Sequence, residues 1–457
     1  MPISAVNPAT GKRIKDYMPL DAHALNAALD RAVAALEHWR GLPMEQRARV
    51  VRSAAEILSS RASEWAERMT TEMGKPISQS RAEAEKCAWV CAFYAQQGEK
   101  MLAMRDVATD APSSYVRYDP LGVILGIMPW NFPFWQVFRF AVPAMIAGNA
   151  VLLKHASNVP GCALDIEAIW RESGLPPNLF QTLLVDAAAA ESLIADPRVA
   201  AVSLTGSEEA GRCVAAAAGR VVKKTVLELG GSDAFVVLAD ADLKAAARAG
   251  AVSRTINSGQ SCIAAKRFIL VESVADDFVE LFRESLRCMR VGDPMDEETE
   301  VGPLARDDLR RELHRQVEAT VSAGAATLLG GAMPAGEGFF YPVTLLDHVT
   351  PDMVAAREET FGPVAAVLRV ASEKQAVDVA NSSRYGLGAS LWTRDLDKGH
   401  DLAARVEAGA VFVNGMVKSD PRLPFGGIKS SGYGRELGME GIREFVNIKS
   451  VWMDGRS

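Results

Sequence analysis

The chain has 457 residues, of which 49% are apolar and 23% charged, with 50 basic against 57 acidic side chains and a net charge of −7. This balance excludes a disordered or fibrous chain, and the length predicts a globular protein of two or more domains. The slight acidic excess argues against a nucleic-acid partner bound through a broad basic surface.

Helices dominate the first part of the predicted structure, because apolar residues recur there every three or four positions. These helices are expected at 24–39, 44–61 and 63–73. From residue 115 onward, short apolar runs alternate with helical segments. Strands are predicted at 121–128, 150–153, 180–185, 200–204, 225–229, 234–237 and 268–271, and helices at 159–173, 243–257 and 276–289. This alternation is typical of an α/β fold with parallel sheets, in two domains that meet near residue 230.

Two short strands, at 115–118 and 446–453, lie outside this alternation. Such segments either pair with another subunit or close their own sheet. The N-terminal segment lacks the apolar core of a secretory signal, and no run of about 20 uninterrupted apolar residues exists. We therefore expect a cytoplasmic protein with no membrane partner.

The six cysteines do not resemble a disulfide framework or a zinc site, because they form no CxxC pair and the six histidines are scattered. No metal is expected. Cys262 differs from the other five, since it follows a polar, glycine-containing loop that leaves its sulfur approachable. The other five lie in apolar or helical contexts and are predicted to be small buried side chains. A loop thiol needs a base to act as a nucleophile.

Glu228 is the best candidate for that base. It ends an apolar strand and is followed by two glycines, and strand ends in α/β sheets are where sites form. Partial burial would raise its pKa toward neutrality, which suits a general base. The alternative is a carboxylate that caps a helix or forms a salt bridge.

A third motif, PWNFPFWQVFR, runs from a strand end through a proline-bounded turn into a helix. Counted from Asn131, Trp135 and Arg139 fall on nearly the same helical face. The three could point into one pocket, with an amide for an oxyanion, an indole wall and a guanidinium for a carboxylate. Alternatively, Trp135 belongs to the core and Arg139 extends to solvent or pairs with an internal acid.

A fourth motif places Gly206 and Ser207 between a strand and a helix, where helix N–H groups can bind an anion such as pyrophosphate. The chain contains no GxGxxG, so the usual dinucleotide fingerprint is absent. The motif by itself is nonspecific. The segments EETFGP and PFGGIKSSGYGRE are further loop-forming runs.

The chain contains, in this order, PWNFP, Lys154, TGS, ELGG, GQxC, EExFGP and PFGGxKxSGxGRE. Together these motifs resemble the aldehyde dehydrogenase superfamily over almost the whole chain. The resemblance implies a Rossmann-like cofactor domain, an α/β catalytic domain and a β oligomerisation arm, in a homodimer or homotetramer. The corresponding ranges are 1–105 and 121–229 for the cofactor domain, 230–428 for the catalytic domain, 106–120 and 446–457 for the arm, and 429–445 for a return segment.

The resemblance also implies the role of each residue. Cys262 matches the nucleophile, Glu228 the base, and Asn131 the amide that forms the oxyanion hole with the Cys262 N–H. The residues expected to bind the cofactor are Trp130, Lys154, Ser157, Gly206, Ser207, Leu229, Glu359 and Phe361. Within that group, Lys154 matches a ribose contact, Trp130 and Ser207 match pyrophosphate contacts, and Glu359 matches a contact to the nicotinamide ribose.

One departure bears on the cofactor. Members that prefer NAD usually place a glutamate three residues past the lysine, where it binds the ribose 2′-hydroxyl and repels a 2′-phosphate. Here that position is Ser157, so NADP is expected in preference to NAD, with NAD still possible.

The expected substrate is a small aldehyde with a distal carboxylate, and the closest resemblance is to bacterial succinate-semialdehyde dehydrogenases. The expected substrate-binding residues are Trp135, Arg139, Ser261, Ser419 and Phe425. Glutarate semialdehyde or a general aliphatic aldehyde remains an alternative substrate, since one methylene changes binding by only about 1–3 kcal/mol. A CoA-acylating dehydrogenase, a non-catalytic member and a cysteine hydrolase are rival functions; Cys262, Glu228 and the cofactor motifs argue against them.

Overall fold

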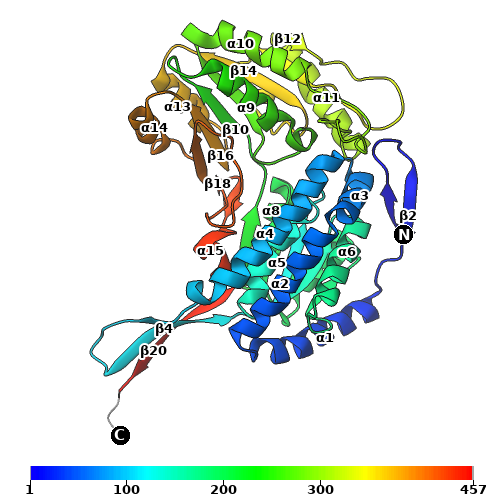
Figure 1. Cartoon of the computed structure of the whole chain (residues 1–457), viewed down its shortest axis with the longest axis vertical. Helices are drawn as coiled ribbons and strands as arrows, with labels where there is room; N and C mark the ends of the chain where they lie inside the picture. The colour runs from blue at the N-terminus through cyan, green and yellow to red at the C-terminus, as the bar shows by residue number, and fades with distance from the viewer. Residues whose placement is uncertain (1, 455–457) are drawn as a thin grey trace.

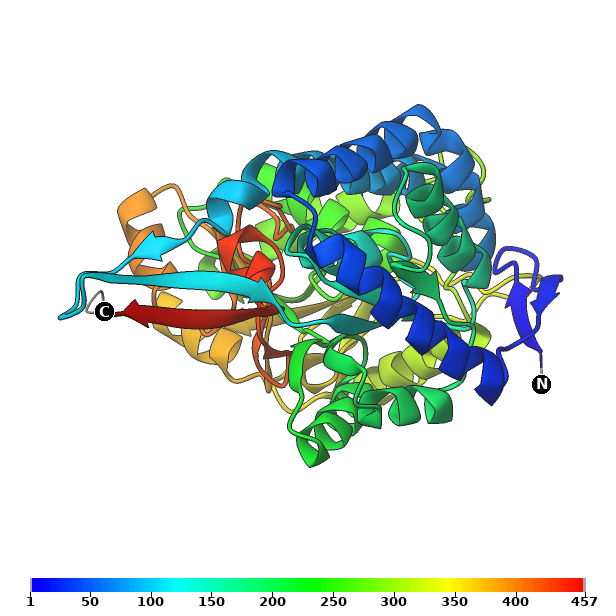
Figure 2. The same ribbon diagram turned by 90° about the horizontal axis from the view of Figure 1, so that it is seen from below.

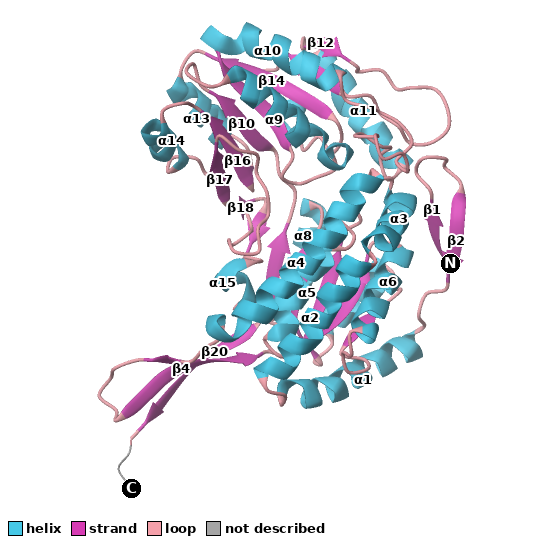
Figure 3. Cartoon of the chain, viewed as in Figure 1, coloured by secondary structure: helices cyan, strands magenta, loops and turns pink. Residues whose placement is uncertain are grey.

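The chain folds into two lobes and a β-ribbon that extends away from one of them (Figure 1). The computed structural model describes residues 2–454. Each lobe contains one mainly parallel sheet, and helices cover the sheets (Figure 3). A two-stranded sheet of β1 (Ile3–Val6) and β2 (Arg13–Tyr17) lies beside the helices of the first lobe.

Four helices precede the first lobe's sheet; the first of them packs on the strands, and the other three pack on the helices that cover the sheet. The four are α1 (Ala22–Arg40), α2 (Met44–Ser60), α3 (Ala62–Met73) and α4 (Ile77–Met101). Helix α1 begins where the Asp21 carboxylate accepts the Ala24 N–H at 2.7 Å. Its buried residues, among them Leu29, Leu36 and Trp39, recur at helical spacing. This apolar face explains why the sequence pattern located the helix.

The first lobe's sheet has the strand order β19-β9-β8-β5-β6-β7, in which only β19 is antiparallel to its neighbour. Its strands are β5 (Val123–Met128), β6 (Ala150–His155), β7 (Phe180–Thr182), β8 (Val199–Thr205), β9 (Lys224–Glu228) and β19 (Gly432–Tyr433). The intervening helices are α5 (Trp135–Ile146), α6 (Pro160–Glu172), α7 (Ala187–Ala195) and α8 (Glu208–Arg220). One continuous apolar core joins this sheet to its helices.

The second lobe's sheet has the order β12-β13-β14-β11-β10-β16-β17, with β12 antiparallel and the rest parallel. Its strands are β10 (Asp233–Val237), β11 (Ala265–Val271), β12 (Ala326–Leu329), β13 (Thr344–Asp347), β14 (Val364–Val370), β16 (Gly388–Trp392) and β17 (Ala410–Val413). The helical segments are α9 (Leu243–Thr255), η1 (Ile256–Gly259), α10 (Glu272–Arg287), α11 (Asp307–Ser322), α12 (Val354–Arg357), α13 (Glu373–Asn381) and α14 (Leu396–Ala403). Separate apolar cores lie on the two faces of the sheet.

The ribbon is a three-stranded antiparallel sheet of β3 (Arg105–Asp106), β4 (Ser113–Pro120) and β20 (Val446–Met453). Strands β4 and β20 pair along their whole length and run side by side away from the lobes (Figure 2). The segments 115–118 and 446–453, whose partner the sequence left open, therefore pair with each other. The remaining elements are β15 (Tyr385–Gly386), β18 (Ile428–Lys429) and α15 (Gly438–Ile442).

The structure corrects the burial predicted for two cysteines. Cys87, Cys91 and Cys162 are buried as expected, but Cys213 and Cys288 are exposed. Helix α8 buries only one face and Cys213 lies on the other, while Cys288 caps the C-terminal end of α10, so an alanine-rich or apolar neighbourhood in the sequence was misleading. None of the helices in residues 2–454 is long and apolar enough to cross a bilayer.

Candidate active site

Three loops that follow neighbouring parallel strands meet at one edge of the first sheet. Strand β8 lies between β5 and β9, and all three run in the same direction. The loops after them contain Pro129, Gly206 and Leu229, and these three residues line one cavity. The carboxyl edge of a parallel sheet is where ligands bind in doubly wound folds. Motifs that are far apart in the sequence thus come together here.

The helix after PWNFP begins only at Trp135. Glu83 of α4 explains this start, because its Oε1 accepts the N–H groups of Phe134 and Trp135, each at 2.9 Å. Asn131 therefore lies in the preceding loop. The prediction that it shares a helical face with Trp135 and Arg139 is wrong, since a carboxylate from another helix determines where α5 begins.

The Asn131 side chain is held firmly beside the loop that carries Cys262. Its Nδ2 donates to the Gln260 carbonyl at 3.0 Å, and its Oδ1 accepts from Gln136 Nε2 at 3.1 Å. The Asn131 carbonyl accepts from Asn257 Nδ2 at 2.6 Å. These contacts fix the orientation of the Asn131 amide beside this loop.

The segment before Cys262 adopts an unusual backbone. Asn257, Ser258 and Gly259 all have positive φ, at 54°, 55° and 76°. A Cβ on Gly259 would lie 2.3 Å from the backbone of Gly362, so only glycine fits there. Left-handed residues of this kind concentrate at functional sites, because surrounding contacts must hold them in place.

Lys266 fixes the loop from the other side. Its buried ammonium group donates to the carbonyls of Ser261, Cys262 and Ala264 at 2.9, 2.8 and 3.3 Å. It also lies 3.4 Å from Glu359 Oε1. One cation thus ties the loop of Cys262 to the Glu359 carboxylate. Lys266 was not among the site residues predicted from the sequence, where its only local signal is a position beside Arg267 at the start of an apolar strand.

Two cavities, of about 210 and 240 Å³, meet at Cys262. Cys262 and Gln136 line both of them. We name them by the motifs in their walls. The cofactor-side cavity contains Trp130, Asn131, Gly206, Ser207, Leu229, Glu359 and Phe361. The substrate-side cavity contains Lys86, Trp135, Arg139, Ser261, Ser419 and Phe425.

The cofactor-side cavity combines the chemistry that a dinucleotide requires. Ser207 caps α8, accepting the Ala210 N–H at 3.2 Å, so the positive end of that helix faces the loop. The Trp130 and Phe361 rings pack edge to face at 5.7 Å. The Glu359 carboxylate accepts the Gly231 N–H at 3.1 Å and would collide with any side chain at position 230. The N-terminus of α8, two aromatic rings and a carboxylate therefore line one cavity.

Lys154 lies near the end of the adjacent strand β6 and Ser157 follows that strand, both outside this cavity's lining. Lys154 is half-buried and Ser157 is exposed. Between them, His155 Nε2 bonds the Pro133 carbonyl at 2.8 Å, while its Nδ1 accepts the Ala156 N–H. Burial lowers the pKa of His155 to about 4. The neutral ring therefore fastens the PWNFP turn to β6.

In the substrate-side cavity, Arg139 is already paired. The side chain is only 2% exposed, forms an ion pair with Glu436 and donates to Thr205 Oγ1 at 3.3 Å. The guanidinium also lies over the Phe425 ring, 4.6 Å from its centre. The internal acid considered as an alternative partner for Arg139 is thus present.

The Glu228 carboxyl group points away from both cavities. It is buried, lines neither of them, and its two oxygens have no hydrogen-bond partner within residues 2–454. A Cβ on Gly426 would lie 2.6 Å from Glu228 Oε1, which places the carboxyl group against the PFGG segment. The carboxyl group therefore lies outside both linings that contain Cys262.

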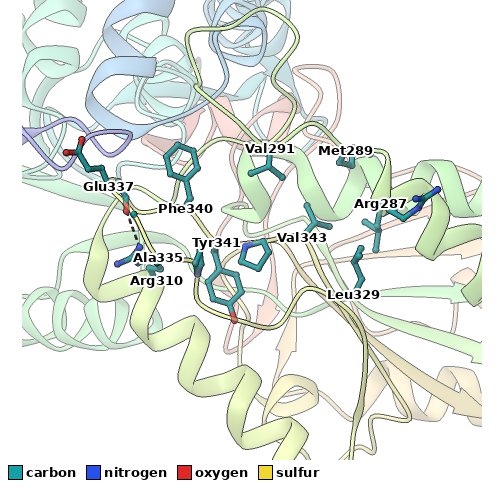
Figure 4. Close-up of a pocket in the computed structure, with 15 residues that line it drawn as sticks. Arg287, Met289, Val291, Arg310, Leu329, Ala335, Glu337, Phe340, Tyr341 and Val343 are labelled. Atoms are coloured by element: carbon teal, nitrogen blue, oxygen red, sulfur yellow. Dashed lines mark hydrogen bonds between the residues drawn. The ribbon is translucent and has the colours of Figure 1, made fainter.

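A further cavity, of about 460 Å³, lies in the second lobe between α10, α11 and the 334–343 segment (Figure 4). Its lining is mostly apolar and includes none of the motif residues. Within residues 2–454, no group of three or more His, Cys, Asp or Glu side chains is arranged to hold a metal ion.

Comparison with known proteins agrees with this geometry. The sequence model that describes the aldehyde dehydrogenase family matches residues 1–451 of this chain. The chain belongs to the aldehyde dehydrogenase family. A Synechocystis protein named as a probable NADP(+) succinate-semialdehyde dehydrogenase is 51% identical, over 99% of this chain and 100% of its own. A Mycobacterium tuberculosis protein named succinate-semialdehyde dehydrogenase 1 (NADP+) is 49% identical over the same shares.

The fold of this aldehyde dehydrogenase has close relatives among solved structures. A Streptococcus pyogenes succinic semialdehyde dehydrogenase in complex with NADP+ superimposes with a TM-score of 0.97 at 36% identity, covering 99% of this chain and 100% of the other. The predicted fold class and the predicted class of enzyme, an oxidoreductase that acts on aldehydes, are both confirmed.

Electrostatics at the site of this aldehyde dehydrogenase favour neutral resting groups. Burial raises the pKa of the Cys262 thiol to about 12, and the charges of Arg139 and Lys266 oppose this shift only in part. Burial also raises the pKa of Glu228 well above its usual range, again against the influence of Arg139. The Cys262 thiol and the Glu228 carboxyl group are therefore both held toward their protonated forms by burial.

Proposed function

We propose that this aldehyde dehydrogenase oxidises succinate semialdehyde to succinate with NADP, and with NAD less effectively. The observation that carries the proposal is the meeting of two cavities at one cysteine, with aromatic and anion-binding groups on one side and cations on the other. Relatives of about 50% identity over the full length bear names with this substrate and cofactor.

The first step is attack of the Cys262 thiolate on the aldehyde carbon. The negative charge that develops on the aldehyde oxygen is stabilised by the Asn131 amide and the Cys262 N–H. Contacts from Gln260 and Gln136 hold the amide in place, so little reorganisation accompanies the reaction.

The cofactor-side residues fit a nicotinamide dinucleotide. The α8 N-terminus with Ser207 would bind the pyrophosphate, Glu359 and Lys154 the two riboses, and Trp130 with Phe361 would flank the bound molecule. When bound, the cofactor supplies the hydride acceptor that no side chain can provide. The chain's own part is to present the substrate carbon on Cys262 at the junction of the cavities.

Once a hydride has left the adduct on Cys262, the thioester that remains is released by hydrolysis. Glu228 acts as the general base that takes a proton from the attacking water. Because its carboxyl group lies against the PFGG segment in the present arrangement, it must turn toward Cys262 for this step. A base at this position favours water over CoA as the acyl acceptor.

We further propose the division of the chain that the family resemblance implies. Residues 1–105 and 121–229 bind the cofactor, 230–428 form the catalytic part, and the arm at 106–120 and 446–457 joins subunits into a homodimer or homotetramer in the cytoplasm. Strand β20 presents Ile448 and Trp452, which are 61% and 54% exposed, and such apolar side chains suit burial against a second copy.

The proposed reaction is tested by steady-state rates with succinate semialdehyde, glutarate semialdehyde and butanal, each with NADP and NAD and with or without CoA. We expect the highest kcat/KM for succinate semialdehyde with NADP, and free succinate as the product. Preference for butanal, or a rate that depends on CoA, would overturn the proposal.

The cofactor preference is tested by Ser157→Glu. A carboxylate beside the ribose would repel a 2′-phosphate, so we expect the ratio of kcat/KM for NADP to that for NAD to fall by at least about tenfold. Ser157→Gln has nearly the same shape without the charge and is expected to change this ratio much less. Equal effects of the two variants would show that Ser157 does not face the phosphate.

A further inference from the structure

Lys86 of α4 extends into the substrate-side cavity that ends at Cys262. Its Nζ donates to Ser419 Oγ at 2.8 Å and lies 4.3 Å from the centre of the Trp135 ring. Lys86 and Ser419 are 333 residues apart in the sequence, so only the fold brings them together.

Lys86 has no carboxylate partner within residues 2–454. The acids near it are engaged elsewhere, since Glu83 pairs with Lys75 and Asp420 pairs with Arg422 at 2.6 Å. A partly buried cation without a counter-ion is costly unless an anion binds beside it. The cavity therefore has an unbalanced positive charge at Lys86.

Arg139, the cation expected from the sequence, differs in this respect. Its charge is balanced by Glu436, and its guanidinium is confined by Thr205 and Phe425. It contributes to the positive potential of the cavity, but a ligand would have to compete with Glu436 for its N–H groups.

We propose that Lys86, together with the Ser419 hydroxyl, binds the distal carboxylate of the substrate and determines specificity for semialdehydes over uncharged aldehydes. This inference rests on the proposed function. Ser419 Oγ accepts its hydrogen bond from Lys86 and so keeps its own proton for a carboxylate oxygen. The Trp135 indole N–H, buried and without a partner within the described chain, is a further donor in the same wall.

The test compares kcat/KM for succinate semialdehyde with that for butanal, its uncharged analogue. A hydrogen bond to a charged group corresponds to a change of about 10- to 100-fold, so Lys86→Met is expected to lower the ratio of the two values by that factor. Lys86→Arg keeps the charge and should retain most of the ratio. Lys100→Met, an exposed lysine on the same helix, is the matched control and should leave the ratio unchanged.

The pH dependence provides a second readout. Burial, and then the charge of Arg139, lowers the pKa of Lys86 to about 8. The other charged or titratable groups near it are Glu83 and Cys87 on α4, and Lys418 and Asp420 in the loop opposite. Below pH 8 the amine is charged and the ratio should be constant; above pH 8 it should fall as the proton is lost. With Lys86→Arg, the ratio should stay constant to higher pH.

The ionisation of Cys262 affects kcat/KM for both aldehydes, so its effect cancels in the ratio. An unchanged ratio in Lys86→Met, with wild-type preference for succinate semialdehyde intact, would overturn the role of Lys86 alone. A wild-type enzyme that does not distinguish the two aldehydes would overturn the proposed function and this site with it.

Discussion

Replacement of Cys262 by alanine is expected to lower kcat for aldehyde oxidation by at least about 10⁴-fold, because a nucleophile that forms a covalent intermediate cannot be replaced by binding contacts alone. The cofactor-side cavity is expected to keep its affinity for NADP. Cys262 contributes only one edge of it, and the groups proposed to bind the pyrophosphate and riboses are unaffected.

Turnover is measured by the appearance of reduced cofactor, and NADP binding by quenching of tryptophan fluorescence, since Trp130 lines the cavity. Cys213→Ala is the matched control, because this thiol is exposed on α8 and touches neither cavity. Substantial oxidation by the Cys262 variant would contradict the covalent mechanism. Loss of NADP binding would instead indicate a collapsed site.

Replacement of Glu228 by glutamine is expected to separate the two halves of the reaction. Acylation of Cys262 should still occur once, giving a burst of about one reduced cofactor per active site. The steady rate that follows should fall by about 10²- to 10⁴-fold, because water then lacks its general base. The carboxyl group has no hydrogen-bond partner among residues 2–454, so glutamine removes no stabilising contact.

Rapid-mixing kinetics distinguish this result from its alternatives. In the wild-type enzyme the rate of thioester hydrolysis should rise with pH as Glu228 loses its proton, and its raised pKa places that rise above the usual carboxyl range. The glutamine variant should lack this rise. Glu99→Gln, on an exposed part of α4, is the control. Equal loss of burst and steady rate would mean that Glu228 acts before the thioester forms.

Local sequence located many of the elements and the candidate reactive groups. Strand β8 was located as a short apolar run, which the structure buries on both faces, and helix α1 by a buried face that repeats with the period of a helix. Cys262 and Glu228 were found because the residues beside them, small polar groups or glycines at the end of an apolar run, are unusual for a core. The order of the motifs then indicated the family.

Polar pairing was not accessible in the same way. Glu83 sets the start of α5, Lys266 holds the loop of Cys262, and Glu436 occupies Arg139. Each of these residues contacts a segment of different sequence, and no local motif links the residue to the segment that it contacts. A periodic apolar pattern predicts that one face of a helix is buried, but it does not predict which polar groups the helix will contact.

The sequence by itself therefore determined the family and the two α/β lobes, because these depend on local periodicity and residue type, and it supplied the residues that we propose carry out the chemistry. The tertiary structure alone decided how charge is distributed in the substrate-side cavity. Arg139 is neutralised by Glu436, whereas Lys86 meets Ser419 and keeps its charge. Whether a buried cation is free for a ligand depends on which charged groups the fold brings within a few ångströms of it. Separation along the chain does not predict that distance in space.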